Sequence, residues 1–217
     1  MTSLPDNILH LPEYHVLATK MEEHDLHYQV EAPEPLACEE CGVESEFVRF
    51  GKRDVAYRDL PIHGKRVTLW VVRRRYTCRA CGRTFRPALP EMVDDHRMTR
   101  RLYNHVEKEA FNHPYAYVAD TTGLDEKTVR EIFKKKAEFL AAWHRFETPR
   151  CLGIDELYLN RRYRCILTNL EERTLLDLLP GRQQDAVTRR LMSMTERHQV
   201  EIVSMDMWKP YRRAVQA

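Results

Sequence analysis

Four of the six cysteines in this 217-residue sequence form two pairs with the spacing of a metal site. The pairs are Cys38-x-x-Cys41 and Cys78-x-x-Cys81, and a glycine follows each pair. Two thiolates three residues apart, on a turn whose next residue accepts a positive φ, present both sulfurs to one ion. Two such turns complete a Cys₄ shell, which is typical of structural Zn²⁺. Coincidental spacing, or a redox motif at one pair, is the alternative interpretation.

Two aspartates hold positions that suit a second kind of metal site. Asp155 lies inside an apolar segment that predicts a strand, and Asp206 directly follows a predicted strand from Glu201 to Met205. In an RNase H-like sheet these strands are neighbours, and paired carboxylates are hard oxygen ligands suited to Mg²⁺. Asp206 alone could form a turn or cap a helix. For Asp155 we expect a functional role, because burying an unpaired carboxylate in an apolar strand is costly.

Charge is segregated along the chain, although 35 Lys and Arg nearly balance 33 Asp and Glu. Residues 1–48 contain one basic and eleven acidic side chains, whereas residues 49–86 contain twelve basic and two acidic ones. A block with a charge of +10 is a candidate footprint for a polyanion. A solvated face that the acidic segment partly neutralises is an equally good interpretation of the charge alone.

The segment between the two cysteine pairs predicts a β-hairpin. Residues 47–77 are rich in β-branched and aromatic residues, and Pro61 to Gly64 interrupt them, so that hairpin and cysteines together predict a zinc ribbon. Side chains alternate along a strand, so Arg73 and Arg75 point to one face, as candidates for binding phosphate, and Arg74 to the other. A second, smaller hairpin is predicted at residues 14–31.

Residues 99–144 change to helical periodicity. Thr99, Pro114 and Asp125 can each begin a helix, and Gly123 ends the second one. The third helix is predicted to carry an apolar stripe from Val129 to Trp143. Small, glycine and apolar residues at positions 119, 123 and 129 are typical of a helix-turn-helix, and a plain three-helix packing unit is the alternative. A recognition helix would offer DNA four side chains: Lys127, Thr128, Arg130 and Lys134.

From residue 151 onward the pattern predicts three strands, a helix from Gln184 to His198 and a fourth strand. Cys151 and Cys165 lack ligand spacing, and we expect them to be buried as small apolar side chains. No stretch approaches the roughly 18 apolar residues of a transmembrane helix, and the N-terminus lacks the features of a signal peptide. We therefore expect a cytoplasmic protein with no membrane partner.

The combined motifs resemble those of ISL3-family transposases of bacterial insertion sequences. The resemblance rests on the Cys-x-x-Cys-Gly pairs, the helix-turn-helix pattern, residues 153–156 (Gly-Ile-Asp-Glu) and residues 203–208 (Val-Ser-Met-Asp-Met-Trp). It implies a DDE enzyme that acts on terminal inverted repeats with Mg²⁺. It also implies that Asp155 and Asp206 are the first two catalytic acids, and that the four cysteines bind zinc.

The resemblance further implies a third acid, a glutamate on a helix well beyond Asp206, and eleven residues follow Asp206 here. We therefore expect an incomplete catalytic domain, so whether the chain is an enzyme stays open. One alternative is a DNA-binding regulator of transposition without catalytic activity. Another is a Mg²⁺-dependent nuclease whose third acid comes from Glu196, Glu201 or a partner chain.

The expected fold is a multidomain α+β chain. We predict an acidic hairpin segment at residues 1–36, a zinc ribbon at 37–90, a helix-turn-helix region at 91–148 and a partial RNase H-like domain, β-β-β-α-β, at 149–217. The expected partner is double-stranded DNA, which the chain binds as a homo-oligomer. Such a protein would be associated with the bacterial nucleoid.

Overall fold

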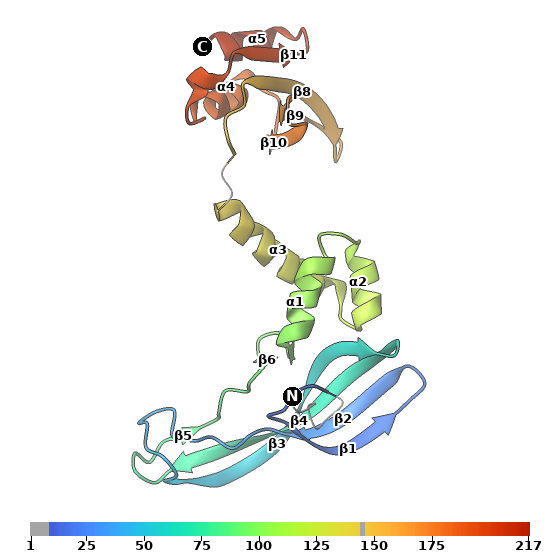
Figure 1. Cartoon of the computed structure of the whole chain (residues 1–217), viewed down its shortest axis with the longest axis vertical. Helices are drawn as coiled ribbons and strands as arrows, with labels where there is room; N and C mark the ends of the chain where they lie inside the picture. Colours follow the sequence, from blue (N-terminus) through green and yellow to red (C-terminus); the bar gives the residue numbers. More distant parts are fainter. Residues whose placement is uncertain (1–8, 144–145) are drawn as a thin grey trace, which may run out of the picture. The chain divides into compact units, whose positions relative to one another are not determined.

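A computed structural model of the chain describes residues 9–143 and 146–217 (Figure 1). The chain divides into two compact units, Met1–Ala142 and Trp143–Ala217. Each unit has its own sheet and its own hydrophobic core. Within the described ranges, none of the helices combines the length and apolar character that crossing a bilayer requires.

The N-terminal unit is built on two hairpins that share one sheet. Strands β1 (His15–Met21) and β2 (Asp25–Glu31) form the smaller hairpin, and β3 (Phe47–Ile62) and β4 (Lys65–Cys78) form the long one. Both hairpins are confirmed. The sequence pattern did not reveal that β2 pairs with β4 in parallel, from Asp25 opposite Arg66 to Glu31 opposite Val72. The strand order is β1-β2-β4-β3, extended beyond β3 by β7 (Met98–Thr99) and β6 (Met92–Val93).

One face of this sheet forms the first hydrophobic core. Alternate residues of β4, namely Val67, Leu69 and Val71, are almost fully buried there. Residues that precede β1 cover them, and the hydroxyl of Tyr14 donates a hydrogen bond of 2.6 Å to the carbonyl of Pro90. Burial of each aliphatic side chain contributes roughly 1.5–3 kcal/mol. The alternation that predicted strands therefore also selects the buried face.

A buried carboxylate joins the sheet to the helices. Asp59 of β3 is fully buried, accepts a hydrogen bond of 2.6 Å from the hydroxyl of Thr99 and forms an ion pair with Arg101. Thr99 also caps helix α1 (Arg100–Glu109), because its hydroxyl accepts from the backbone N–H of Leu102. Removing one member of such a network leaves a buried polar group unpaired, so we regard it as the anchor of α1.

Helices α2 (Tyr115–Thr122) and α3 (Glu126–Trp143) follow α1, which confirms the three predicted helices and their starts. The apolar stripe predicted on α3 is present, but only its first part is buried. Val129 and Ile132 are fully buried, whereas Phe139, Leu140 and Trp143 are exposed. The reason is length, because α3 has 18 residues and the helices that pack against it have ten and eight.

The C-terminal unit has a four-stranded sheet in the order β10-β9-β8-β11. Strands β8 (Cys151–Leu159), β9 (Arg162–Asn169) and β10 (Thr174–Leu178) are antiparallel neighbours, and β11 (Ile202–Met205) pairs with β8 in parallel. The predicted order of three strands, a helix and a strand is confirmed. Cys165 is fully buried in this core, as expected, whereas the expectation for Cys151 is wrong, because this first residue of β8 is only partly buried.

The prediction of a helix from Gln184 to His198 is wrong. Helix α4 spans Gln184–Met192, and a short 3₁₀ turn follows at Arg197–Gln199. Between them Glu196 takes a left-handed conformation with φ 55, which an α-helix cannot contain. A further helix, α5 (Lys209–Gln216), was not predicted, and it buries Tyr211 and Ala214 against the sheet core.

Candidate functional site

The four paired cysteines converge on one point of the N-terminal unit. Their sulfur atoms all lie within 4.8 Å of one another, with 3.9 Å between Cys38 and Cys81 and 3.7 Å between Cys41 and Cys78. Four sulfurs at about 2.3 Å from a central ion lie about 3.8 Å apart in a tetrahedron. The donor set and its spacing therefore fit Zn²⁺, and four ligands leave no open position, so the site is structural.

Each half of the cluster is a tight turn of the kind that its glycine predicts. The N–H groups of Gly42 and Gly82 donate to the carbonyls of Cys38 and Cys78, with φ values of 75° and 70°. The backbone N–H groups of Cys81 and Ala80 lower the pKa of the Cys78 thiol to about 7. At Cys78 the turn therefore favours the thiolate form that a metal requires, whereas the pKa of the neighbouring Cys41 thiol is raised.

The three consecutive arginines of β4 have different partners. Arg73 forms an ion pair of 2.8 Å with Asp94, and its side chain is 13% exposed. Arg74 pairs with Glu31 from β2. The guanidinium of Arg75 lies 4.6 Å from the centre of the exposed Phe50 ring. A phosphate would have to compete with Asp94 for Arg73, while Arg75 has no acidic partner among the residues that the structure describes.

The predicted DNA-reading side chains begin at the first turn of α3. Asp125 caps this helix by accepting a hydrogen bond of 2.9 Å from the N–H of Thr128, and the Thr128 hydroxyl donates to the same carboxylate. The backbone hydrogen bond makes the largest contribution to lowering the pKa of Asp125, and the hydroxyl makes the second largest. Lys127, Arg130 and Lys134 recur at intervals of three and four residues, so they share one exposed face of the helix.

The two predicted catalytic aspartates lie at the end of the paired segment of two neighbouring strands, Asp155 within β8 and Asp206 directly after β11. The last register pair of β8 and β11 joins Ile154 to Met205, and Asp155 and Asp206 each come next along the chain. The expectation that Asp155 is buried is wrong, because it is exposed. Side chains alternate, so Ile154 faces the core and Asp155 faces the opposite side of the sheet. Each carboxylate accepts a hydrogen bond from the next backbone N–H.

Arg182, which belongs to no sequence motif, contacts several elements near these aspartates. Arg182 forms an ion pair of 2.5 Å with Glu156 of β8. Its guanidinium also lies 4.5 Å from the ring centre of Tyr163 and 4.8 Å from that of Trp208. These partners are distant in sequence and come from β8, β9 and the segment after β11, so no local pattern could have identified Arg182.

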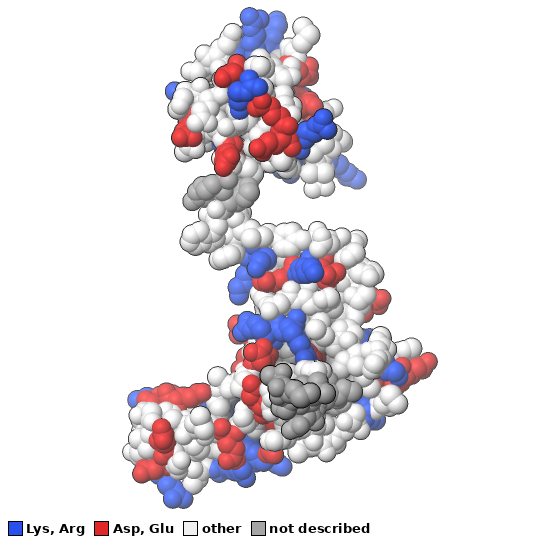
Figure 2. Space-filling model, in the orientation of Figure 1, with Lys and Arg blue, Asp and Glu red and all other residues white. Residues whose placement is uncertain are grey.

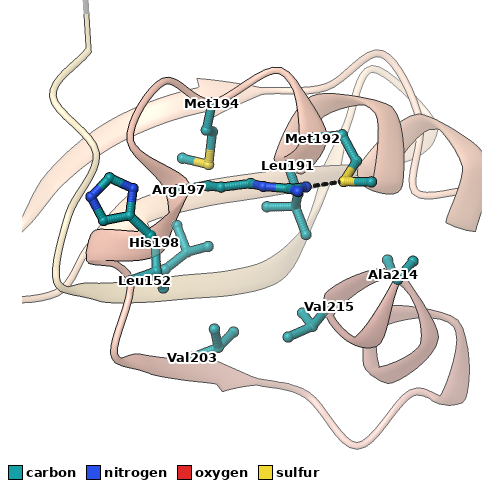
Figure 3. Close-up of a pocket in the computed structure, with 11 residues that line it drawn as sticks. Leu152, Leu191, Met192, Met194, Arg197, His198, Val203, Ala214 and Val215 are labelled. Atoms are coloured by element: carbon teal, nitrogen blue, oxygen red, sulfur yellow. Dashed lines mark hydrogen bonds between the residues drawn. The ribbon is translucent and has the colours of Figure 1, made fainter.

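The same unit contains an apolar cavity of about 430 Å³ (Figure 3). Leu152 and Val203 line it from the sheet, Leu191 from α4 and Val215 from α5. The guanidinium of Arg197 extends toward the sulfur of Met192 across its wall, as the dashed line in Figure 3 shows. The cavity has no paired carboxylates or thiolates, so its lining does not suit metal chemistry.

Comparison with known protein families identifies two segments of the chain. A family model described as "zinc-finger of transposase IS204/IS1001/IS1096/IS1165" matches residues 34–81, which include all four clustered cysteines. The model of the ISL3 DDE family, described as "Transposase", matches residues 152–217, which include Asp155 and Asp206. A search of curated proteins found no match.

Proposed function

Because the chain belongs to the ISL3 family of transposases, we propose that it binds double-stranded DNA at the terminal inverted repeats of an insertion sequence. The β3–β4 ribbon and helices α2 and α3 make this contact, and the chain acts on DNA as a homo-oligomer in the bacterial nucleoid. The observation that carries the proposal is a block of twelve basic and two acidic residues at positions 49–86. It overlaps the four-cysteine cluster and the segment that matches a transposase zinc finger.

Helices α2 and α3 act as a helix-turn-helix in this proposal. The three residues between them include Gly123, which has a φ of 72° and ends α2. A side chain there would also place its Cβ 2.7 Å from the Arg66 side chain, so glycine suits both the turn and the packing. Ala119 and Val129 are buried on the two helices, which supports a close crossing.

The exposed face of α3 would then lie in the DNA major groove. Lys127 and Lys134 have only long ion pairs of 3.9 and 3.7 Å with exposed glutamates, which contribute little and leave both ammonium groups accessible. Arg130 lies 5.9 Å from the Tyr115 ring centre, close to the limit of a cation–π contact. The Thr128 hydroxyl donates its hydrogen bond to Asp125, so the methyl group of Thr128 would be the part that contacts a thymine methyl.

The C-terminal unit is proposed to be RNase H-like, with Asp155 and Asp206 binding Mg²⁺. Three antiparallel strands followed by a parallel fourth support this assignment. Both carboxylates would supply oxygens from the side of the sheet opposite the core. With Mg²⁺ held there, a water or a 3′-hydroxyl would be activated and the departing oxygen of a phosphodiester would be stabilised.

One observation favours a second candidate, a regulator that binds the repeats without cleaving them. Among the described residues, the cysteine cluster is the only group of three or more potential metal ligands that converge. Glu156, the acidic neighbour of Asp155, is engaged by Arg182. A partner chain that supplies a third carboxylate would instead complete a Mg²⁺-dependent nuclease.

A gel-shift and cleavage assay on one labelled duplex that carries a terminal repeat tests these proposals. The duplex is incubated with the chain in Mg²⁺ and in EDTA. Retardation in both, with Mg²⁺-dependent nicking that Asp155→Ala and Asp206→Ala abolish, supports the transposase. Retardation without nicking supports the regulator. A chain that retards neither this duplex nor an unrelated one contradicts DNA binding.

A further inference from the structure

Cations lie directly opposite one another in the middle of the long hairpin. Lys52 of β3 is opposite Arg74 of β4, and the next pair joins Arg53 to Arg73. Like charges directly opposite in an antiparallel pair destabilise the sheet. Two such pairs in succession therefore carry a cost in stability that needs a compensating anion.

Among the residues that the structure describes, only the β4 member of each pair has an acidic partner. Arg74 pairs with Glu31, and Arg73 pairs with Asp94. Among the described residues, Lys52 forms no hydrogen bond or ion pair. Arg53 has only a longer-range Coulombic interaction with Asp94. The two exposed cations of β3 are thus left to bind an anion from outside.

Their strand is accessible because it is an edge at this point. Within the described residues, β3 pairs on its other side only at Arg58, with Met98 of β7. Lys52 and Arg53 point to opposite faces of the strand and therefore flank this free edge. Figure 2 shows Lys and Arg side chains gathered along the lower border of the N-terminal unit, over the region of β3 and β4.

A β-bulge lies in the same strand, two residues before Lys52, and it carries an aromatic ring. The register passes from Arg49 opposite Tyr76 to Gly51 opposite Arg75, so Phe50 has no partner in the ladder. Gly51 has a φ of 142°, which allows the strand to bend there. Phe50 is 57% exposed and is in contact with the Arg75 guanidinium on one side.

We propose that Phe50, Lys52, Arg53 and Arg75, the ribbon patch, clamp the backbone of duplex DNA. Lys52 and Arg53 bind phosphates, and the Phe50 ring packs on sugar and base edges beside them with Arg75 holding the ring. This inference rests on the proposed DNA binding and adds residues that read no sequence. It assigns the phosphate contacts to the cations of β3 in preference to Arg73 and Arg74, which the chain itself neutralises.

Duplex DNA fits this patch because its backbone offers phosphates to the cations on both sides of the strand edge, and its sugars and base edges offer apolar surface to an aromatic ring. Charged side chains also protect an edge strand from pairing with another chain. That protective role predicts no change in DNA binding when the charges are removed, so binding measurements separate the two roles.

The test is fluorescence anisotropy of the full chain with a fluorescein-labelled duplex of mixed sequence, over a range of salt concentrations. Each phosphate contact contributes about 0.9 to the slope of log K against log salt. The double variant Lys52→Gln, Arg53→Gln should lower the magnitude of this slope by about 2. The control Arg212→Gln, Arg213→Gln removes the same charge from exposed positions of α5 and should leave the slope unchanged.

Phe50 has a different signature because its contact releases no counterions. Phe50→Ala should lower affinity by about tenfold at every salt concentration, with the slope unchanged. Val48→Ala, at an exposed position of the same strand, is the matched control and should bind like the wild type. Zinc content and circular dichroism verify that each variant is folded.

The outcomes separate this inference from the proposed function. If the wild-type chain binds the duplex but the Lys52 and Arg53 changes leave the salt slope intact, the ribbon patch alone is overturned. The same holds if the α5 control lowers the slope by an equal amount. Unchanged affinity of Phe50→Ala overturns the role of the ring. A wild-type chain that does not bind duplex DNA overturns the proposed function and the ribbon patch together.

Discussion

Asp155 of β8 and Asp206, the first residue after β11, each lie one residue beyond Ile154 and Met205, the last register pair of these two parallel strands. Fifty residues lie between them along the chain, and the pairing of β8 with β11 brings their backbone positions close together. Asp155 follows the core-facing Ile154 within β8, so its side chain points to the face of the sheet opposite the core, and the Asp206 side chain is also exposed. This relationship makes a shared cation the first property to test.

Replacing either aspartate should weaken binding of a divalent cation without unfolding the chain. We expect Asp155→Asn and Asp206→Asn each to reduce Mn²⁺ affinity by at least about tenfold, because each removes a charged oxygen ligand. Electron paramagnetic resonance of free Mn²⁺ measures this affinity. Glu172→Gln, in an exposed turn, is the matched control. Equal Mn²⁺ binding by all three variants would show that the pair does not hold a metal.

The cysteine cluster should lose its metal when any one ligand is changed. Cys38→Ser or Cys78→Ser should reduce the zinc content from about one ion per chain toward zero, because zinc binding supplies much of the folding free energy of a ribbon. Mass spectrometry of the metal content measures the stoichiometry. Cys151→Ser, outside the cluster, should keep its zinc. Full zinc retention by the Cys38 variant would contradict the four-cysteine site.

The cap of α3 should contribute to stability in a manner that depends on pH. The pKa of Asp125 is lowered in the folded chain, mainly by the backbone N–H of Thr128, so the ionised form is the stabilising one. At pH 7, Asp125→Ala should lower the free energy of unfolding by about 1 kcal/mol. The difference should shrink as the pH falls below the ordinary value of about 3.9 and toward the lower folded pKa.

Urea unfolding, followed by circular dichroism at several pH values, measures this dependence. Asp120→Ala, at an exposed position of α2, should change the free energy of unfolding by less than about 0.5 kcal/mol. A loss at position 125 that is the same at pH 7 and at pH 3 would mean that the carboxylate charge is not the source of the stabilisation.

The exposed face of α3 should affect DNA affinity but not helix content. Lys127→Ala and Arg130→Ala should each weaken binding of a terminal-repeat duplex by about tenfold, since each removes a contact with a base or a phosphate. Lys108→Ala, an exposed change on α1, should leave affinity unchanged. If the Lys127 and Arg130 variants bind as tightly as the wild type, the assignment of α3 as the recognition helix is wrong.

Removal of Arg182 should destabilise the C-terminal unit. Arg182→Ala leaves the mostly buried Glu156 without its partner, which should cost about 1–3 kcal/mol of unfolding free energy. Arg182→Lys keeps the charge but loses the flat group that lies against Tyr163 and Trp208, so it should recover only part of this stability. Thermal unfolding compares the variants, and full recovery by lysine would assign the whole effect to charge.

The sequence by itself determined the features that depend on neighbouring residues. The cysteine turns, the Thr99 and Asp125 caps, the glycine at the end of α2 and the two hairpins all follow from backbone chemistry within a few positions. Local spacing sets which N–H group meets which acceptor, so these predictions did not need the fold. The overlong helix to His198 failed because nothing in its periodicity reveals the left-handed Glu196.

Only the tertiary structure decided which residues from distant segments meet. The parallel pairing of β2 with β4, the neutralisation of Arg73 by Asp94 and the exposure of Asp155 all depend on contacts across many intervening residues. The same holds for Arg182, whose three partners lie on separate elements. Several distant partners are compatible with each local pattern, and the packing of the whole core selects among them.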